Sequence, residues 1–212
     1  PGNGSKRPET RAAILGFLKT ADPAFAPSCD ASAPIVLSAG RFTYYKGFEH
    51  LLEAADLVDK ALLVIAGSGP AWTKMEALRR RLGLAHKVCL PGHVPDEALQ
   101  RLMSACSLFC LPSIERTEAF GMVLLEAMYF GKPVISTKVG GSGMQTVNRH
   151  GSTGLTVPPA DPPELARAIQ KLVDHSELRA QMGRQAQERV RNNFLISTVA
   201  EQMLQTYRQA LR

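Results

Sequence analysis

The chain has 212 residues, of which 45% are hydrophobic and 21% are charged, a composition typical of a globular domain with a full core. No apolar run approaches the roughly 20 residues that a membrane-spanning helix needs, and the polar start does not resemble a signal peptide. The 25 Lys and Arg residues exceed the 19 Asp and Glu residues, for a net charge of +6. This mild and scattered excess suits anionic ligands or an anionic membrane surface, and it gives no reason to expect a nucleic-acid partner.

Residues 1–33 are rich in Pro, Gly, Ala and Ser, which predicts a linker that is ordered only in part, with a short helix over 10–19. From residue 34 onward, short apolar segments alternate with helical patterns. The predicted strands cover 34–40, 61–66, 87–90, 107–111, 133–136 and 154–157. The predicted helices cover 47–58, 70–82, 95–105, 121–130, 161–174, 176–192 and 195–211.

Strands that are apolar throughout and separated by helices are buried on both faces of a sheet. The pattern therefore predicts an α/β domain over 34–212 with a doubly wound, mostly parallel, Rossmann-like sheet. Asp161 before Pro162 is a good helix cap. The one tight basic cluster, at residues 79–81, is interpreted as a solvated helix end.

The cysteines Cys29, Cys89, Cys106 and Cys110 show no C-x-x-C spacing, and no pair of histidines accompanies them, which argues against zinc. Three of the four fall in apolar segments and are expected to be reduced and buried. We therefore expect a cytoplasmic protein, with contact at the inner face of the membrane as a further option. Because the chain starts with Pro and lacks an initiator Met, we also expect it to be a piece of a longer protein.

In parallel sheets of this kind, ligands bind outside the carboxyl ends of the strands. Those ends lead into the loops 40–46, 67–70, 91–94, 112–120 and 137–143, which are rich in glycine or in charge. The first loop carries Gly40, Arg41 and Lys46, and an Arg fork beside a Lys charge suits a diphosphate. The alternative is two exposed basic residues near a helix start.

The other glycine-rich loops are less specific. Gly67 opens a turn that lacks large side chains, but a dinucleotide fingerprint would need a third glycine where Trp72 stands, and the chain has no P-loop motif. His93 would be placed to touch a base or sugar, or would be an ordinary exposed loop histidine. The Gly-rich stretch at 140–143 is either a ligand loop or a flexible turn.

The stretch ERTEAFGMVLLEAM, residues 115–128, places three acids in or beside an apolar run. Gly121 opens a helix whose first N–H groups would face a phosphate. Glu118 lies in the preceding loop, and Glu126 would lie in the second helical turn, at the mouth of the cleft, where its carboxylate could accept two hydrogen bonds from a ribose diol. The alternatives are an ion-paired Glu126 and solvent-exposed Glu118 and Glu115.

E-A-F-G-x-x-x-x-E-A-M at 118–128, followed by G-K-P-V-I-S at 131–136, resembles the E-x7-E signature of retaining GT-B glycosyltransferases of the GT4 type. The motifs around it stand in the expected order: G-R-x-x-x-x-K-G (40–47), I-A-G-S-G-P (65–70), P-G-H-V (91–94), L-P-S (111–113) and G-L-T-V-P-P (154–159). The similarity covers residues 34–212, and the ordered set is more specific than any one motif.

The resemblance implies the C-terminal, nucleotide-sugar-binding half of an enzyme that transfers a hexose from a UDP- or GDP-sugar to a glycan or lipid-linked acceptor, as in cell-envelope polysaccharide synthesis. Arg41 and Lys46 match the diphosphate pair, Glu118 the acid that contacts the donor sugar, and Glu126 the acid that holds the ribose. Further donor-binding positions are implied at Gly40, Gly67, Gly92, His93, Val94, Phe120, Gly121, Met122 and Val123. The resemblance implies no metal and no cofactor.

Two departures from the family pattern limit these expectations. Many relatives carry an acid after the glycine pair, where this chain has Gly143, Met144 and Gln145. The N-terminal domain that supplies the acceptor site is not part of the chain, and the helix at 195–212 would be directed toward it. We therefore expect weak donor binding and no sugar transfer by this chain alone. The alternatives are a nucleotide-sugar epimerase of the same fold and a nucleotide-binding module without catalysis.

Overall fold

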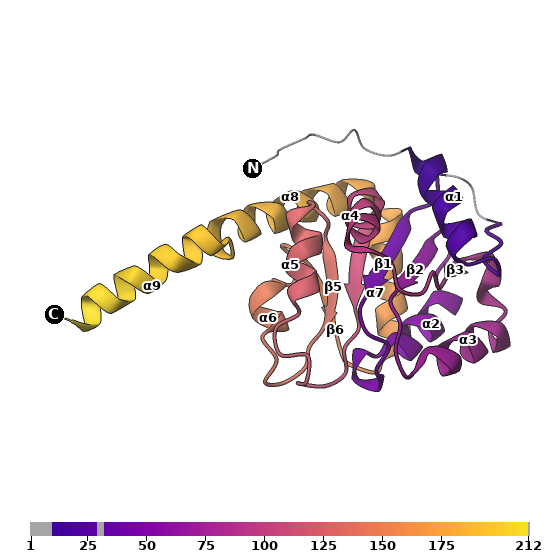
Figure 1. Cartoon of the computed structure of the whole chain (residues 1–212), viewed down its shortest axis with the longest axis horizontal. Coiled ribbons are helices and arrows are strands. Elements are labelled where there is room, and N and C mark those ends of the chain that lie inside the picture. Colours follow the sequence, from indigo (N-terminus) through magenta and orange to yellow (C-terminus); the bar gives the residue numbers. More distant parts are fainter. Residues whose placement is uncertain (1–9, 29–31, 212) are drawn as a thin grey trace.

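The computed structural model describes residues 10–28 and 32–211, and over this part of the chain six parallel strands form one sheet (Figure 1). The strand order is β3-β2-β1-β4-β5-β6, and every neighbouring pair is parallel. The predicted doubly wound α/β sheet is therefore confirmed. The strands are β1 (Ile35–Ala39), β2 (Leu62–Ala66), β3 (Val88–Cys89), β4 (Leu108–Leu111), β5 (Val134–Thr137) and β6 (Gly154–Val157).

Helices connect the strands, and further helices precede the first strand and follow the last one. The α-helices are α1 (Arg11–Ala21), α2 (Phe48–Asp56), α3 (Trp72–Arg81), α4 (Asp96–Ala105), α5 (Met122–Tyr129), α6 (Met144–Val147), α7 (Pro162–Asp174), α8 (Ser176–Asn193) and α9 (Ile196–Ala210). Two short 3₁₀ turns are η1 (Tyr44–Lys46) and η2 (Leu84–His86). At the start of α7 the Asp161 side chain accepts a hydrogen bond from the amide of Glu164 at 3.0 Å, so the predicted cap is confirmed.

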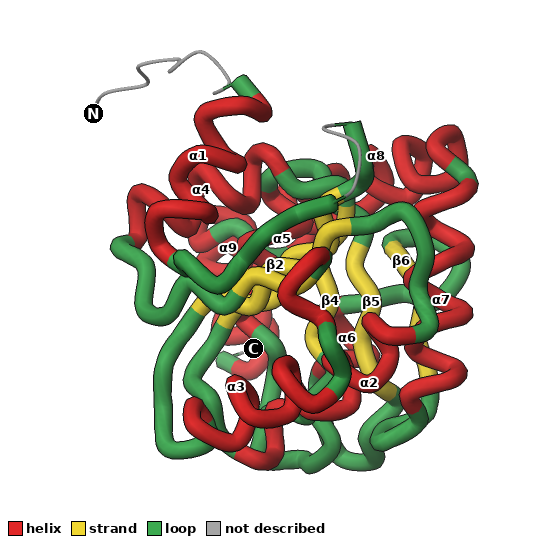
Figure 2. Tube along the Cα trace, turned by 90° about the vertical axis from the view of Figure 1, so that its right-hand side faces the viewer, coloured by secondary structure: helices red, strands yellow, loops and turns green. Residues whose placement is uncertain are grey.

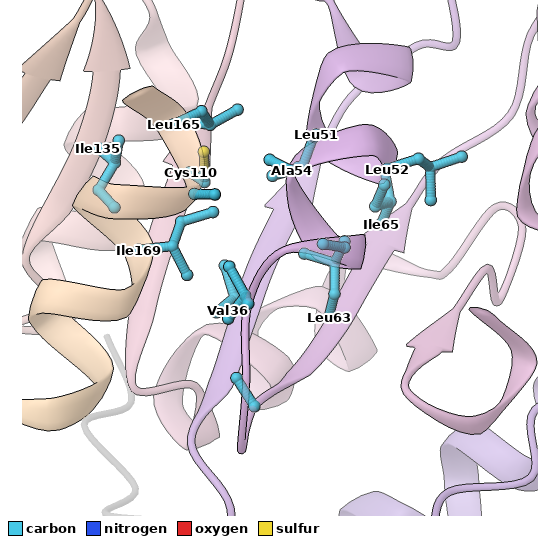
Figure 3. Close-up of a cluster of buried hydrophobic side chains, with 14 of the residues drawn as sticks. Val36, Leu51, Leu52, Ala54, Leu63, Ile65, Cys110, Ile135, Leu165 and Ile169 are labelled. Carbon is cyan, nitrogen blue, oxygen red and sulfur yellow. The ribbon is translucent and has the colours of Figure 1, made fainter. Parts of the chain in front are cut away.

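The sheet lies between two layers of helices, as Figure 2 shows. Successive residues of a strand point to opposite faces, and β1 follows this rule. Val36 packs in the cluster formed with α2 and α7, whereas Ile35 and Leu37 pack in the cluster formed with α1, α4 and α5. Figure 3 shows the first cluster, in which side chains of α2 and α7 meet residues of the strands. Buried apolar side chains cover both faces of the sheet, which explains why the strands are apolar throughout.

The described part of the N-terminal segment is packed on the sheet, so the prediction of a linker over 1–33 is wrong for these residues. Helix α1 agrees with the short helix predicted at 10–19, and its Ile14 and Leu18 are buried one turn apart against the layer that contains α4. Phe25 is also buried. The Pro- and Ala-rich composition led to the linker prediction, although Ile14, Leu18 and Phe25 are spaced so that all three reach the core.

A buried ion pair fastens this segment to the rest of the domain. Asp22 pairs with Arg79 of α3, and both side chains are almost completely buried. The Asp22 carboxylate also accepts a hydrogen bond from the amide of Leu90 at 2.8 Å. The interpretation of residues 79–81 as a solvated helix end is therefore wrong for Arg79. Its partner lies 57 positions earlier in the chain, so spacing along α3 could not reveal the pair.

Cys89, Cys106 and Cys110 are buried, as predicted, and burial raises the pKa of each thiol well above its usual value. These thiols stay protonated at neutral pH and act as small apolar side chains. Cys29 lies outside the described residues.

Helix α9 continues beyond α8 and extends away from the body of the domain (Figure 1). None of its residues is buried. Its exposed apolar residues are Ile196, Val199, Met203, Leu204 and Tyr207. Across 10–28 and 32–211, no helix combines the length and the apolar character that crossing a bilayer requires.

We predict that Asp22→Ala destabilises the domain by about 3–5 kcal/mol, because it leaves a guanidinium buried without its counter-charge. Urea unfolding followed by circular dichroism measures the loss. The matched control is Glu164→Ala, which breaks an exposed pair with Arg167 and should cost less than about 1 kcal/mol. Equal costs for the two variants would contradict the view that Asp22 anchors the N-terminal segment.

Candidate functional site

All six strands end at the same edge of the sheet because they are parallel. Strand β1 lies between β2 and β4, so the chain turns one way after β1 and the other way after β4. The loops that follow these two strands, 40–47 and 112–121, therefore belong to crossovers that run in opposite directions, and sheets of this kind bind ligands in the crevice at that switch point. The candidate site lies at this crevice.

An ion pair joins the two sides of the crevice. Lys46, at the end of η1, pairs with the carboxylate of Glu118 in the loop after β4. The two side chains are only 13% and 11% exposed. The hydroxyl of Ser113 donates to the same carboxylate oxygen, Oε2, at 3.3 Å. Two residues that are 72 positions apart are thus brought together, and the alternative of a solvent-exposed Glu118 is wrong.

Glycines let the loops at this edge approach one another closely. The amide of Gly67 donates to the carbonyl of Gly92 at 2.7 Å, which fastens the loop after β2 to the loop after β3. Gly67 has φ = 138°, and a Cβ at that position would overlap the carbonyl oxygen of Gly40. The glycine is therefore needed for the packing of these loops, whether or not a ligand approaches them.

One hollow of about 440 Å³ lies over the ends of β1 and β2 and the loop after β3. Its lining combines bare backbone with a few side chains: Ala39, Gly40, Arg41, Ala66, Gly67, Ser68, Gly69, His93, Val94, Asp96 and Leu99. Arg41 is exposed and forms no ion pair with any described residue, in contrast to Lys46. His93 is also exposed. This hollow offers a free cation and open glycine backbone.

Helix α5 begins beside the crevice. Gly121 precedes it in the left-handed conformation, with φ = 74°, and this turns the chain so that α5 can start at Met122. Met122 is 61% exposed and Val123 is partly buried. Phe120 packs edge-on against Phe194, with ring centroids 6.1 Å apart. The predicted helix start at residue 121 is thus confirmed to within one position.

Glu126 lies in the second turn of α5, and its side chain is exposed rather than buried in the core. It lines a second hollow of about 550 Å³, together with Asp96 and several apolar side chains of α4 and α5. Among the described residues, no basic side chain forms an ion pair with Glu126, so the ion-paired alternative is not what the structure shows. Partial loss of hydration and, secondarily, the negative charge of Asp96 raise the pKa of Glu126 above its usual value.

The Gly-rich loop after β5 is tied to the segment that carries Glu118. The hydroxyl of Ser142 donates to the carbonyl of Glu118 at 2.5 Å, and the amide of Gly143 donates to the carbonyl of Ala119 at 2.6 Å. These bonds place the loop beside the crevice. Glu115 points elsewhere and accepts a hydrogen bond from the Tyr44 hydroxyl at 2.8 Å.

The sequence did not single out Ser113, Ser142 or Asp96. Ser113 stands inside the L-P-S motif, Ser142 inside the Gly-rich stretch 140–143, and Asp96 at the start of the helix predicted at 95–105. Over the residues that the structure describes, no three His, Cys, Asp or Glu side chains gather closely enough to hold a metal ion.

The strand order and the residues at the carboxyl edge of the sheet together define a doubly wound α/β domain of the GT-B type. Cations and carboxylates line its crevice. The family model described as "Glycosyl transferases group 1" matches residues 25–189. The chain belongs to this family of glycosyltransferases.

Individual relatives agree with this assignment. The D-rhamnosyltransferase WbpZ of Pseudomonas aeruginosa is 39% identical over 158 residues, which cover 74% of this chain and 41% of the relative. The O-antigen chain mannosyltransferase C of Escherichia coli is 32% identical over 171 residues, covering 81% and 44%. The sucrose-phosphate synthase structure from Thermosynechococcus elongatus superposes with a TM-score of 0.77 at 33% identity, covering 89% and 50%. The chain thus spans about half the length of the relatives it matches.

We predict that Glu126→Gln slightly stabilises the domain at pH 7. A glutamate whose pKa is raised on folding opposes folding once it is ionised, so its contribution becomes less favourable as pH rises through that pKa. The expected rise in Tm is about 1–2 °C, because Glu126 is exposed enough for water to screen its charge. The rise should shrink as the pH is lowered and the wild-type carboxyl becomes protonated.

Thermal unfolding between pH 4 and 8 tests this prediction, with Glu201→Gln on the exposed helix α9 as the matched control. A lower Tm for Glu126→Gln at pH 7 would show that Glu126 has a stabilising partner. It would contradict the view that the ionised Glu126 opposes folding.

Proposed function

We propose that this chain is the donor-binding half of a retaining glycosyltransferase of the GT4 type, which transfers a hexose from a nucleoside diphosphate sugar. The observation that carries the proposal is the ion pair that joins Lys46 and Glu118 across the crevice. Arg41, which forms no ion pair with a described residue, lines the hollow over the ends of β1 and β2. The E-x7-E motif ends at Glu126, which faces the adjoining hollow. Cations for a diphosphate and acids for hydroxyl groups thus lie along one edge of the sheet.

In the proposed mechanism the diphosphate leaves the anomeric carbon as the glycosidic bond to it breaks. Arg41, Lys46 and the N–H groups at the start of α5 stabilise the negative charge that grows on the diphosphate. These interactions lower the barrier only to the extent that they are stronger in the transition state than with intact donor. Glu118 accepts a hydrogen bond from a sugar hydroxyl and orients the ring. The acceptor hydroxyl forms the new C–O bond to the anomeric carbon on the face that the diphosphate leaves, and its proton passes to an oxygen of the departing diphosphate.

Glu126 holds the ribose in this proposal, because an ionised carboxylate can accept hydrogen bonds from both hydroxyls of a diol. The loop of Gly92, His93 and Val94 lies beside the base. The segment from Phe120 to Val123 lies beside the phosphates and the sugar. Among these residues, Glu126 has the most direct test, because its proposed target is a single chemical group.

The acceptor in this proposal is a glycan or a lipid-linked sugar of cell-envelope polysaccharide synthesis, and the enzyme works in the cytoplasm or at the inner face of the membrane. The relatives named as a D-rhamnosyltransferase and an O-antigen chain mannosyltransferase support this class of reaction. The exposed apolar residues of α9 are proposed to pack on the domain that supplies the acceptor site. The chain alone then binds donor without transferring sugar.

Calorimetry of this chain with UDP, GDP, ADP and NAD tests the proposed function. We expect a nucleoside diphosphate to bind, without any added metal, and NAD not to bind. A non-catalytic nucleotide-binding module would share this result, so sugar transfer must be measured on the full-length enzyme. Binding of NAD alone would favour a dinucleotide enzyme and would contradict the proposal, whereas a nucleotide-sugar epimerase of the same fold would also bind the nucleoside diphosphate.

Arg41→Ala should weaken nucleoside diphosphate binding by about 1.5–3 kcal/mol, the usual range for a hydrogen bond to a charged group. Lys46→Ala should weaken it less, because Lys46 must exchange Glu118 for the diphosphate, whereas Arg41 has no ionic partner among the described residues to give up. Calorimetry measures both, with Arg80→Ala on the exposed side of α3 as the control. Unchanged affinity in both site variants would contradict the proposal that Arg41 and Lys46 bind the diphosphate.

Glu126→Gln should reduce discrimination between a ribose and a 2′-deoxyribose nucleoside diphosphate with the same base. Wild-type protein should prefer the ribose form, since the deoxy form leaves one hydrogen bond to the carboxylate unmade. The ratio of the two Kd values, measured by calorimetry, is the readout. If the variant loses affinity for both forms equally, the diol role is wrong.

A further inference from the structure

Glu118 lies in a loop, yet the fold holds all of its polar atoms but one. Its amide donates to the carbonyl of Glu115 at 3.1 Å, and its carbonyl accepts from the Ser142 hydroxyl at 2.5 Å. Its carboxylate oxygen Oε2 accepts from both Lys46 and Ser113. No described residue donates to the other carboxylate oxygen, Oε1. Oε1 is therefore the acceptor that remains for a ligand.

The two partners of Oε2 respond differently when a ligand binds. In the proposed function, on which this inference rests, Lys46 turns from Glu118 to the diphosphate. The Glu118 side chain is only 11% exposed, so little water can replace the lost partner, and a poorly hydrated carboxylate without hydrogen bonds is costly. Among the described residues, Ser113 is then the donor that still holds Oε2.

Ser113 is fixed to the sheet and not to the loop that carries Glu118. It is fully buried just after β4. Its carbonyl accepts a hydrogen bond from the hydroxyl of Thr137, which is also buried, at the end of β5. Because β4 and β5 are paired neighbours, this bond ties Ser113 to the adjoining strand. The Ser113 hydroxyl can thus stay in place while Lys46 changes its partner.

We infer that Ser113 is a positioning residue for Glu118. Its hydroxyl holds Oε2 after Lys46 has moved to the diphosphate, and this keeps Oε1 directed at a hydroxyl of the donor sugar. Ser113 touches no part of the ligand and acts only through Glu118. Loss of the Ser113 hydroxyl therefore weakens the binding of the sugar and not that of the diphosphate.

Calorimetry of this chain with UDP and UDP-glucose, and with GDP and GDP-mannose, tests this role. Ser113→Ala should weaken binding of the nucleotide sugar about three- to tenfold, the effect of one typical hydrogen bond. Binding of the nucleoside diphosphate should change less than about twofold, because water can reach Glu118 when no sugar is present. Ser113→Cys keeps the size of the side chain but donates only weakly, so it should show an intermediate loss.

A double-mutant cycle separates positioning from a general effect on packing. In a Glu118→Ala background, Ser113 has no carboxylate to hold. Ser113→Ala should then change the affinity for the nucleotide sugar less than about twofold. An equal loss with and without the Glu118 carboxylate would show that Ser113 acts through packing alone and would overturn the inference.

Ser38→Ala is the matched control. Ser38 is also a fully buried serine of the sheet, and its hydroxyl donates to the carbonyl of Cys110 at 2.6 Å instead of to Glu118. The control variant should lower the Tm, because it loses a buried hydrogen bond, but it should leave both affinities unchanged.

Two outcomes distinguish this inference from the proposed function. If wild-type protein binds the nucleotides and Ser113→Ala changes neither affinity, or lowers both equally, Ser113 does not position Glu118 and the proposed function stands. If wild-type protein binds neither the nucleoside diphosphates nor their sugar conjugates, the proposed function and this inference fail together.

Discussion

The constraint on which the rest of the structure depends is the parallel pairing of all six strands. Each pair requires a crossover over the faces of the sheet, so helices cover both faces and the strands must be apolar on both sides. The same pairing places every strand's carboxyl end at one edge. Residues as far apart as Arg41, His93 and Glu126 can line adjoining hollows for this reason alone.

The charges at that edge are arranged so that the site is partly neutralised before any ligand arrives. Lys46 and Glu118 neutralise each other in a largely buried contact, and Ser113 adds a hydrogen bond. Removing one partner would leave a poorly solvated charge, which is costly. A ligand that binds here must replace the contact with one of comparable strength, and a diphosphate for Lys46 with a sugar hydroxyl for Glu118 is such a replacement. Arg41 and Glu126 have no such partner within residues 10–28 and 32–211.

The N-terminal segment shows where composition misled the sequence analysis. Pro, Gly, Ala and Ser are common in linkers, but Ile14, Leu18 and Phe25 complete the core, and Asp22 neutralises Arg79. The strands and most helices were predictable because the period of their apolar residues is a local property. The buried Asp22–Arg79 pair was not, because neither residue carries a local sign of a partner that lies 57 positions away.

The sequence by itself determined the alternation of strand and helix, the parallel sheet, and the loops in which site residues would lie, because each depends on residues close together in the chain. The ordered motifs pointed to the same family that the comparisons identify. Only the tertiary structure decided which of those residues meet: that Glu118 pairs with Lys46, that Glu126 is exposed beside Asp96 instead of buried in the core, and that the N-terminal helix belongs to the domain. Such contacts depend on which strands pair as neighbours in the sheet, and this order is a property of the whole fold.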